Sequence, residues 1–267
     1  MPAASVARRL GLALVLAAFA TAGLAQAKKA PAYEPVSGQE GKDVVWVPTS
    51  QALVDKMLDM ARVTKDDFVM DLGSGDGRTV ITAAKRGARA MGVEYNPDMV
   101  ALSKRNAEKA GVSERATFVK ADLFQTDFSK ASVITMFLLP DINIKLRPKI
   151  LALKPGTRVV SNSFTMGDWK EDERATVSQQ AGCETSWCTA LLWIVPARVE
   201  GTHKLPQGEV TFKQRYQELS GDFVTGGRNY ALEGKVRGEE VSFTAGGRVY
   251  RGRFSGGRLE LRNGPAG

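Results

Sequence analysis

Acidic side chains interleaved with glycines form the most informative stretch of this sequence, FVMDLGSGDGR at positions 68–78. Asp71 follows a short apolar run, and Gly73, Gly75 and Gly77 come after it at alternate positions. Glycines in such a turn let the backbone approach a ligand that a Cβ atom would exclude. The carboxylates in the turn favour a ligand that carries a cationic group. The stretch therefore predicts a binding site after a buried strand.

The spacing of these residues excludes two phosphate-binding motifs. The dinucleotide pattern G-x-G-x-x-G would need a glycine where Arg78 stands, and G-x-x-x-x-G-K-[ST] is absent. Asp71 and Asp76 would also repel a phosphate. An acid about 20 residues further on, at the end of the next strand, can bind ribose hydroxyls, and Glu94 ends the apolar run that begins at Ala90. We expect a nucleoside ligand with a cationic amino-acid end.

Apolar runs and helical patterns alternate through the first two thirds of the chain, which predicts α/β architecture. After a capped helix at 51–62, we expect strands at 68–70, 90–93, 117–120, 133–139 and 158–161, with helices between them and a final antiparallel strand at 190–195. Such alternation indicates a Rossmann-like, doubly wound, mainly parallel sheet. Its ligand should lie at the carboxyl ends of the strands.

With acids at three successive strand ends, the region from about Trp46 to Ala197 resembles the class I S-adenosylmethionine-dependent methyltransferases. The resemblance implies S-adenosyl-L-methionine as cofactor, with Glu94 on the ribose and Asp122, in KADLF, on the adenine amino group. A Rossmann-like domain for another nucleotide, or for none, is the alternative. The cofactor-binding residues that the resemblance implies are Asp71, Gly73, Gly75, Asp76, Gly77, Glu94, Asn96, Asp122 and Leu123.

The methyl acceptor in this class usually contacts the segment after the fourth strand, here MFLLPDIN at 136–143. Enzymes for exocyclic base amines carry an Asn/Asp-Pro-Pro-aromatic motif there, which this chain lacks, so no nucleic-acid acceptor is indicated. VPTS at 47–50, DLGSGDGR and FLLP together are similar to small mitochondrial-type protein-lysine methyltransferases and their bacterial relatives. That resemblance implies a protein lysine as acceptor, on a membrane-embedded or membrane-associated partner.

A lysine acceptor must arrive as a neutral amine, and an apolar mouth lowers its pKa. Phe137, Leu138 and Pro140 are the expected mouth, and Asp141 and Asn143 are the nearest candidate catalytic residues. No metal site is expected, because the sequence contains one histidine and its two cysteines lack zinc-ligand spacing. Transfer from an activated sulfonium needs mainly alignment of donor and acceptor.

The first 27 residues read as a secretory signal peptide. Arg8 and Arg9 precede an apolar run, and small residues lead to cleavage after Ala27. An uncleaved membrane anchor is the alternative. Removing the leader takes away its two arginines and changes the formal charge from +8 to +6, a modest and scattered excess. We expect an exported, periplasmic protein with a flexible arm at 28–43 and a methyltransferase domain at 44–200.

Export leaves two other functions open, since the methyl donor is made inside the cell. One is an exported nucleoside-binding sensor or scaffold without chemistry, and the other is a small-molecule methyltransferase. Export would also permit a disulfide between Cys183 and Cys188 in CETSWC, which we read as the tip of a hairpin. Two reduced, partly buried thiols are the alternative.

The sequence pattern changes at Gly201, where short runs of alternating apolar and polar residues begin, divided by glycine pairs. The stretch EGKVRGEEVSF at 233–243 returns as RGRFSGGRLEL at 251–261. We expect a small β-rich domain at 201–267, an antiparallel meander of hairpins with one apolar face docked on the larger domain. It would act as a lid, a partner-docking sheet or a stabilising appendage.

Overall fold

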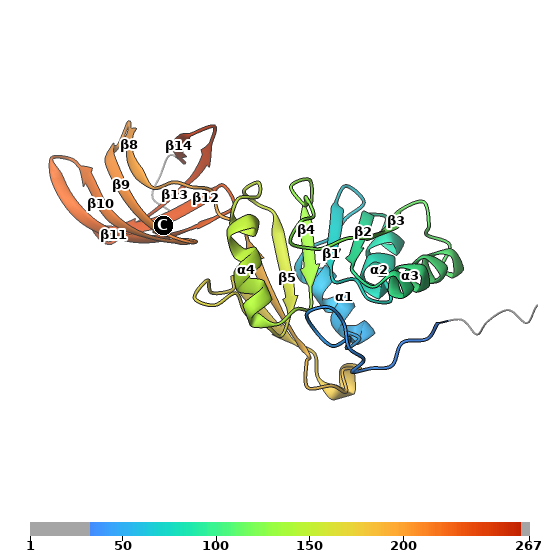
Figure 1. Cartoon of the computed structure of the whole chain (residues 1–267). Helices are drawn as coiled ribbons and strands as arrows, with labels where there is room; N and C mark the ends of the chain where they lie inside the picture. Colours follow the sequence, from blue (N-terminus) through green and yellow to red (C-terminus); the bar gives the residue numbers. More distant parts are fainter. Residues whose placement is uncertain (1–32, 263–267) are drawn as a thin grey trace, which may run out of the picture. The chain divides into compact units, whose positions relative to one another are not determined.

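The computed structural model describes residues 33–262, so the predicted leader at 1–27 and the start of the arm lie outside the described residues. The described chain forms two sheets of seven strands each (Figure 1). The elements of the first half are α1 (Gln51–Met60), β1 (Phe68–Leu72), α2 (Arg78–Lys85), β2 (Arg89–Glu94), α3 (Pro97–Lys109), β3 (Ala116–Lys120), β4 (Val133–Met136), α4 (Pro140–Leu151), β5 (Arg158–Asn162), β6 (Glu173–Thr176), the short 3-10 helix η1 (Gln179–Ala181) and β7 (Thr189–Ile194). No helix among the described residues is both long and apolar enough to cross a bilayer.

The first sheet has the strand order β3-β2-β1-β4-β5-β7-β6. Strands β1 to β5 pair in parallel, and β7 is antiparallel to both of its neighbours. The expected doubly wound, mainly parallel sheet with an antiparallel strand near its end is therefore confirmed. The edge strand β6 was not predicted, because its residues ERAT are mostly exposed and carry no apolar alternation. Strand β4 is shorter than expected and ends at Met136, since Pro140 already begins α4.

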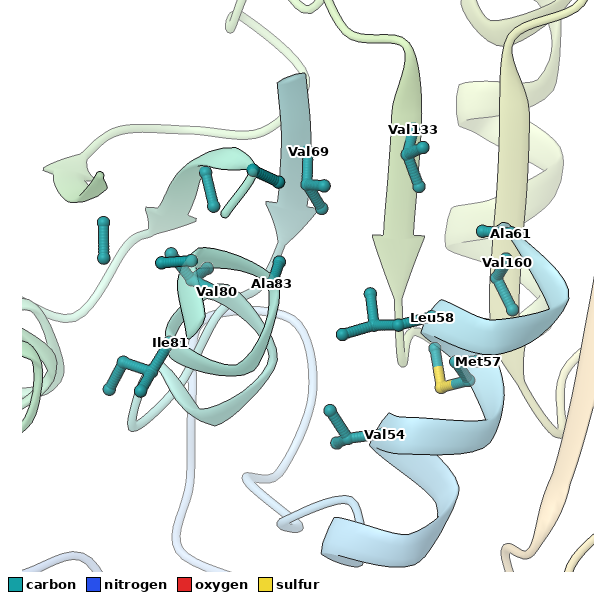
Figure 2. Close-up of a cluster of buried hydrophobic side chains, with 14 of the residues drawn as sticks. Val54, Met57, Leu58, Ala61, Val69, Val80, Ile81, Ala83, Val133 and Val160 are labelled. Atoms are coloured by element: carbon teal, nitrogen blue, oxygen red, sulfur yellow. The ribbon is translucent and has the colours of Figure 1, made fainter. Parts of the chain in front are cut away.

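Both faces of this sheet are covered by helices, and successive side chains of a strand point to opposite faces. Val69, Val133 and Val160 pack against α1 and α2 (Figure 2), whereas their neighbours Met70 and Ile134 face the cluster that contains α4. Helix α1 begins where the Ser50 hydroxyl accepts a hydrogen bond from the Leu53 amide. Burial on both faces fixes the strands and so fixes the edge at which they end.

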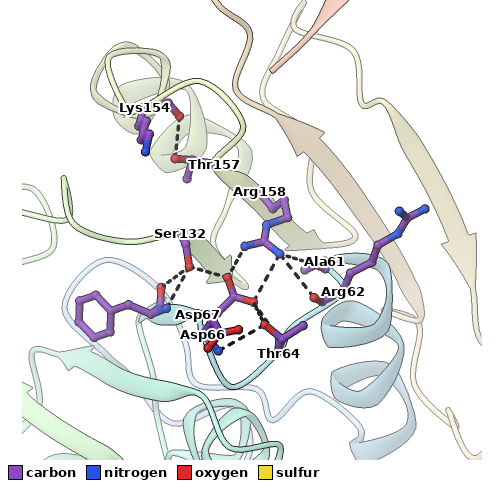
Figure 3. A network of polar contacts seen from close by, with 10 residues as sticks. Ala61, Arg62, Thr64, Asp66, Asp67, Ser132, Lys154, Thr157 and Arg158 are labelled. Carbon is purple, nitrogen blue, oxygen red and sulfur yellow. Dashed lines mark hydrogen bonds and ion pairs between the residues drawn. The ribbon is translucent and has the colours of Figure 1, made fainter. Parts of the chain in front are cut away.

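A buried carboxylate, Asp67, ties the opposite, amino-terminal ends of β1, β4 and β5 together (Figure 3). It accepts hydrogen bonds from the Thr64 amide at 2.8 Å and the Ser132 hydroxyl at 2.7 Å, and it pairs with the Arg158 guanidinium. Burial acts to raise the pKa of Asp67, but these donors outweigh it and hold the pKa below its ordinary value. The network therefore stabilises the fold while the carboxylate is ionised.

Replacing Asp67 should destabilise the protein without touching the ligand site. Asp67→Ala leaves a partly buried Arg158 without its carboxylate, and we expect a loss of about 3 kcal/mol in the free energy of unfolding. Asp66→Ala is the matched control, because its side chain is 79% exposed and pairs with the equally exposed Lys65. Urea unfolding at pH 7 measures both. Because the pKa is lowered, the difference between Asp67→Ala and the parent should shrink as pH falls below about 4. Equal unfolding midpoints for the two variants would contradict this account.

The second sheet is an antiparallel meander in chain order, β8 (Gly201–Leu205), β9 (Gly208–Arg215), β10 (Glu218–Thr225), β11 (Arg228–Arg237), β12 (Glu240–Ala245), β13 (Arg248–Ser255) and β14 (Arg258–Leu261). The two copies of the sequence echo are the hairpins β11–β12 and β13–β14. Strands β8 and β10 were not predicted, because neither holds an uninterrupted alternating pattern.

The meander curls into a near-barrel, with its first and last strands close to each other. Its inner face buries an aromatic core in which Phe243 contacts Phe212 and Phe223 at ring-centroid distances of 5.5 and 5.6 Å. His203 on β8 lies 5.5 Å from the Phe254 ring on β13. The expectation that the apolar face needs the larger domain to cover it is wrong, because the curled sheet covers that face itself.

Candidate active site

The predicted ligand residues meet in one pocket at the carboxyl edge of the first sheet. Its lining includes most of the expected cofactor set, namely Asp71, Gly73, Gly75, Asp76, Glu94, Asn96, Asp122 and Leu123. Of the expected acceptor residues, Phe137 and Leu138 line it. Pro140, Asp141 and Asn143 are absent from the lining, as is Gly77. The segment 39–49 supplies a further wall.

Two glycines of the turn after β1 have separate structural roles. Gly75 has φ +52°, and a Cβ added there would lie 2.5 Å from the indole Nε1 of Trp46. Gly77 has φ +84°, and its added Cβ would lie 2.8 Å from atoms of both Phe118 and Ser103. Gly75 thus lets Trp46 close over the turn, whereas Gly77 packs the start of α2 against β3 and α3. The role of Gly77 is packing beneath the pocket.

Asp71 lies at the end of β1 with 6% of its surface exposed. Its partner in the register of β4 is Thr135, whose hydroxyl donates to the Asp71 carboxyl at 2.6 Å. Burial raises the pKa of Asp71 to about 7, and the Thr135 hydrogen bond acts against this while the carboxylates of Glu94 and Asp76 add to it. A cationic ligand group would stabilise the ionised form of this buried carboxyl, because a nearby positive charge lowers its pKa.

Glu94 is fixed by backbone amides on both of its oxygens. One oxygen accepts from the Gly75 amide and the other from the Asn96 amide, each at 2.9 Å. The Asn96 side chain caps α3 by accepting from the Asp98 amide at 2.9 Å. Asn96 therefore positions Glu94 and begins the helix. The carboxylate keeps lone pairs for a ligand, because each of its oxygens has one protein donor.

Asp122 and Asp76 are both engaged by cations from this chain. The Lys42 ammonium donates to Asp122 at 2.7 Å and lies 4.7 Å from the Tyr95 ring. The Arg78 guanidinium binds both oxygens of Asp76 and also donates to the Thr49 carbonyl at 2.7 Å. These contacts hold the segment 42–49 across the pocket. Lys42 was missed, because nothing local marks its partner 80 residues away.

These residues fit S-adenosylmethionine by charge and by shape. Asp71 suits its cationic amino-acid end, Glu94 its ribose and Asp122 its adenine, and Gly73 and Gly75 expose their backbone in the wall of the pocket. When bound, the cofactor supplies an activated methyl group on a sulfonium. The chain's own part is to hold and orient the two reactants and to exclude water, with Trp46 and Val47 covering the turn.

This arrangement, on this strand order, defines a class I S-adenosylmethionine-dependent methyltransferase. The model of the ANTKMT methyltransferase domain matches residues 71–173. A protein-lysine N-methyltransferase of Saccharolobus islandicus is 48% identical over 133 residues, which cover 49% of this chain and 83% of that protein. The chain therefore belongs to this family of protein-lysine N-methyltransferases.

Two relatives from Mus musculus show how the likeness is distributed. The adenine nucleotide translocase lysine N-methyltransferase is 34% identical over 170 residues, covering 61% of this chain and 73% of that protein. A second lysine N-methyltransferase, named for ATP synthase, is 36% identical over 143 residues, covering 53% of this chain and 56% of that protein. The match to the second enzyme thus spans little more than half of its length.

A solved structure extends the likeness to a bound cofactor product. The crystal structure described as an RNA methyltransferase from Salinibacter ruber in complex with S-adenosyl-L-homocysteine is 43% identical to this chain. The superposition covers 57% of this chain and 95% of the Salinibacter ruber chain, with a TM-score of 0.52. Cofactor binding is therefore shared, while the named acceptors differ.

Asp71 should make cofactor binding depend on pH. A cationic ligand lowers the pKa of Asp71 from about 7, so binding below that pH releases a proton. The affinity for S-adenosylhomocysteine should rise with pH between about 5 and 7, by at most tenfold per unit, and level off above. Isothermal titration across pH, in two buffers of different ionisation enthalpy, measures both effects. Asp71→Asn should bind more weakly and lose the slope, and an identical slope in that variant would refute the assignment.

Glu94 should carry the ribose contact. Glu94→Ala removes charge-assisted hydrogen bonds worth about 1.5–3 kcal/mol each, so we expect cofactor affinity to fall by a factor of about ten or more. Glu108→Ala, on the exposed side of α3, is the control and should bind as the parent does. Titration with S-adenosylhomocysteine, with thermal unfolding to confirm a folded variant, decides the question. Unchanged affinity in folded Glu94→Ala would exclude the role.

Proposed function

We propose that this protein transfers a methyl group to the side-chain amine of a lysine on a membrane-associated protein partner. The observation that carries the acceptor assignment is the 48% identity to the archaeal protein-lysine N-methyltransferase over 83% of that enzyme. The membrane partner is suggested by the mouse relative that is matched over 73% of its length, because its name specifies the adenine nucleotide translocase.

The pocket supports an amine acceptor through its apolar wall after β4. Phe137 is half-buried and Leu138 is 3% exposed, and both line the pocket. No acidic residue in the described lining comes from the segments after β4 or β5. An ammonium that enters such surroundings has a lowered pKa and loses its proton more readily to water. The wall therefore favours the neutral amine that the reaction needs.

The residues considered as bases do not fit that role. Asp141 is exposed in the first turn of α4 and lies outside the pocket lining, as does the exposed Pro140. Asn143 is fully buried, and its Nδ2 donates to the carbonyls of Phe164 and Thr165 at 3.3 and 3.2 Å. An amide with these bonds supports the backbone and takes no proton. The proposed mechanism therefore relies on alignment and desolvation rather than on a side-chain base.

Export is part of this proposal and rests on two observations. The leader pattern at 1–27 lies outside the described residues, whereas Cys183 and Cys188 form a disulfide in the structure. Disulfides persist mainly in oxidising compartments such as the bacterial periplasm.

A labelled-methyl assay tests the acceptor. Purified protein and donor are incubated with membrane, soluble-protein and RNA fractions of a bacterial lysate, and Glu94→Ala serves as the control. We expect label in the membrane fraction that resists ribonuclease, with methyl-lysine identified by mass spectrometry of the labelled band. Label removed by ribonuclease would replace a protein acceptor by RNA. Cofactor binding without label in any fraction would support the sensor or scaffold instead.

The position of the mature amino terminus tests export. If the leader is cleaved as proposed, protein recovered from the periplasm of a Gram-negative bacterial host should begin at or near Lys28. Intact-mass measurement and terminal peptide mapping give the answer directly. An intact chain in the membrane fraction would favour the uncleaved anchor, and an intact chain in the cytoplasm would refute export.

A further inference from the structure

Three aromatic side chains meet at the edge of the pocket, and none of them belongs to the predicted cofactor set. The rings of Phe137 and Phe164 are stacked, with centroids 5.8 Å apart and an interplanar angle of 18°. The Trp187 ring lies 6.0 Å from Phe137 at 59°. All three line the pocket. Sequence reasoning pointed to Phe137 alone, because the three are separated along the chain.

The strand order places this aromatic cluster away from the acids. Asp71, Glu94 and Asp122 lie at or just after the ends of β1, β2 and β3, on one side of the sheet. Phe137 follows β4 and Phe164 follows β5, on the other side. Strand β7 is antiparallel to β5, so the residues before it reach the same edge. The pocket therefore has an acidic half and an aromatic half.

Phe164 is held in place by buried polar groups. Its carbonyl accepts from the Ser161 hydroxyl at 2.8 Å and from Asn143 Nδ2 at 3.3 Å, and both donors belong to fully buried residues. The preceding residue, Ser163, has φ +58°, an unfavourable conformation for a side chain other than glycine. Such a conformation persists only where the surroundings determine it. This gives Asn143 a function as a positioning residue for Phe164.

Trp187 is presented to the pocket by the disulfide loop. The Cys183–Cys188 bridge closes the loop, and the Thr185 hydroxyl accepts from the Trp187 amide at 3.2 Å. The tryptophan remains 36% exposed, although one needed only for packing would be covered. Its one described aromatic neighbour is Phe137. The loop thus fixes a partly exposed aromatic face beside the two phenylalanines.

We infer that the Phe137, Phe164 and Trp187 cluster binds the acceptor lysine side chain, and that Trp187 determines acceptor affinity through the disulfide that presents it. This rests on the proposed function. Aromatic faces attract an arriving ammonium through the ring quadrupole, with tryptophan the strongest of the three types. Their apolar surface covers the lysine methylenes. The acids on the other half remain available to the donor.

Substitution of Trp187 separates acceptor binding from donor binding. The substrate is the protein acceptor identified in the labelled-methyl assay. Trp187→Ala should raise the KM for this acceptor about tenfold or more, while kcat changes less and the Kd for S-adenosylhomocysteine stays within about twofold of the parent value. Trp187→Phe should recover most of the loss. Val224→Ala, an exposed apolar residue of the second sheet, is the control and should match the parent. Equal KM for Trp187→Ala and the parent overturns the inference.

Reduction tests the part played by the disulfide. Dithiothreitol, or the double variant Cys183→Ser and Cys188→Ser, should raise the acceptor KM of the parent but add little to that of Trp187→Ala, because both changes act on one element. If loss of the disulfide raises the acceptor KM of Trp187→Ala as much as that of the parent, or does not raise the KM of the parent, the disulfide does not act through Trp187. If the parent protein labels no lysine at all, the proposed function itself is wrong. If the parent and Trp187→Ala label lysine equally well, the proposed function stands and only the role of Trp187 is wrong.

Discussion

Two hydrogen bonds to one carboxylate connect the parts of this site. The amides of Gly75 and Asn96 both donate to Glu94, so the turn after β1, the end of β2 and the start of α3 are fixed together. The turn can lie this close to β2 because Gly92 has no side chain, and a Cβ added there would lie 2.4 Å from the Ser74 hydroxyl oxygen. The turn that forms the pocket wall, Glu94 and the start of α3 therefore depend on one another. Loss of this link would release the turn that covers Asp71.

Much of the fold could be predicted from sequence because its signals are local. Continuous apolar runs marked β1, β4 and β5, and glycine-rich turns marked their ends. The three acids of the pocket could be predicted to meet because each lies at or near the end of a strand, and the parallel sheet brings such ends to one edge. Strands β6, β8 and β10 were missed, because exposed or interrupted strands are defined by their neighbours rather than by their own composition.

The rest of the site depends on contacts between distant residues. Lys42 meets Asp122 across 80 positions, and Phe164 and Trp187 reach Phe137 only because β5 and β7 are adjacent. Asn143 was a candidate catalytic residue because it follows the fourth strand, yet its side-chain amide donates to backbone carbonyls. Sequence alone identified the acidic half of the pocket and left the aromatic half almost unmarked.

The near-barrel has a consequence for how this chain folds. Each of its strands pairs with the next along the chain, so most of its contacts join residues close in sequence, and little loop entropy is lost in forming them. Its inner aromatic core comes from its own strands together with the residues just before them. We therefore expect the near-barrel to fold faster than the first sheet, whose parallel pairs join residues far apart in the sequence.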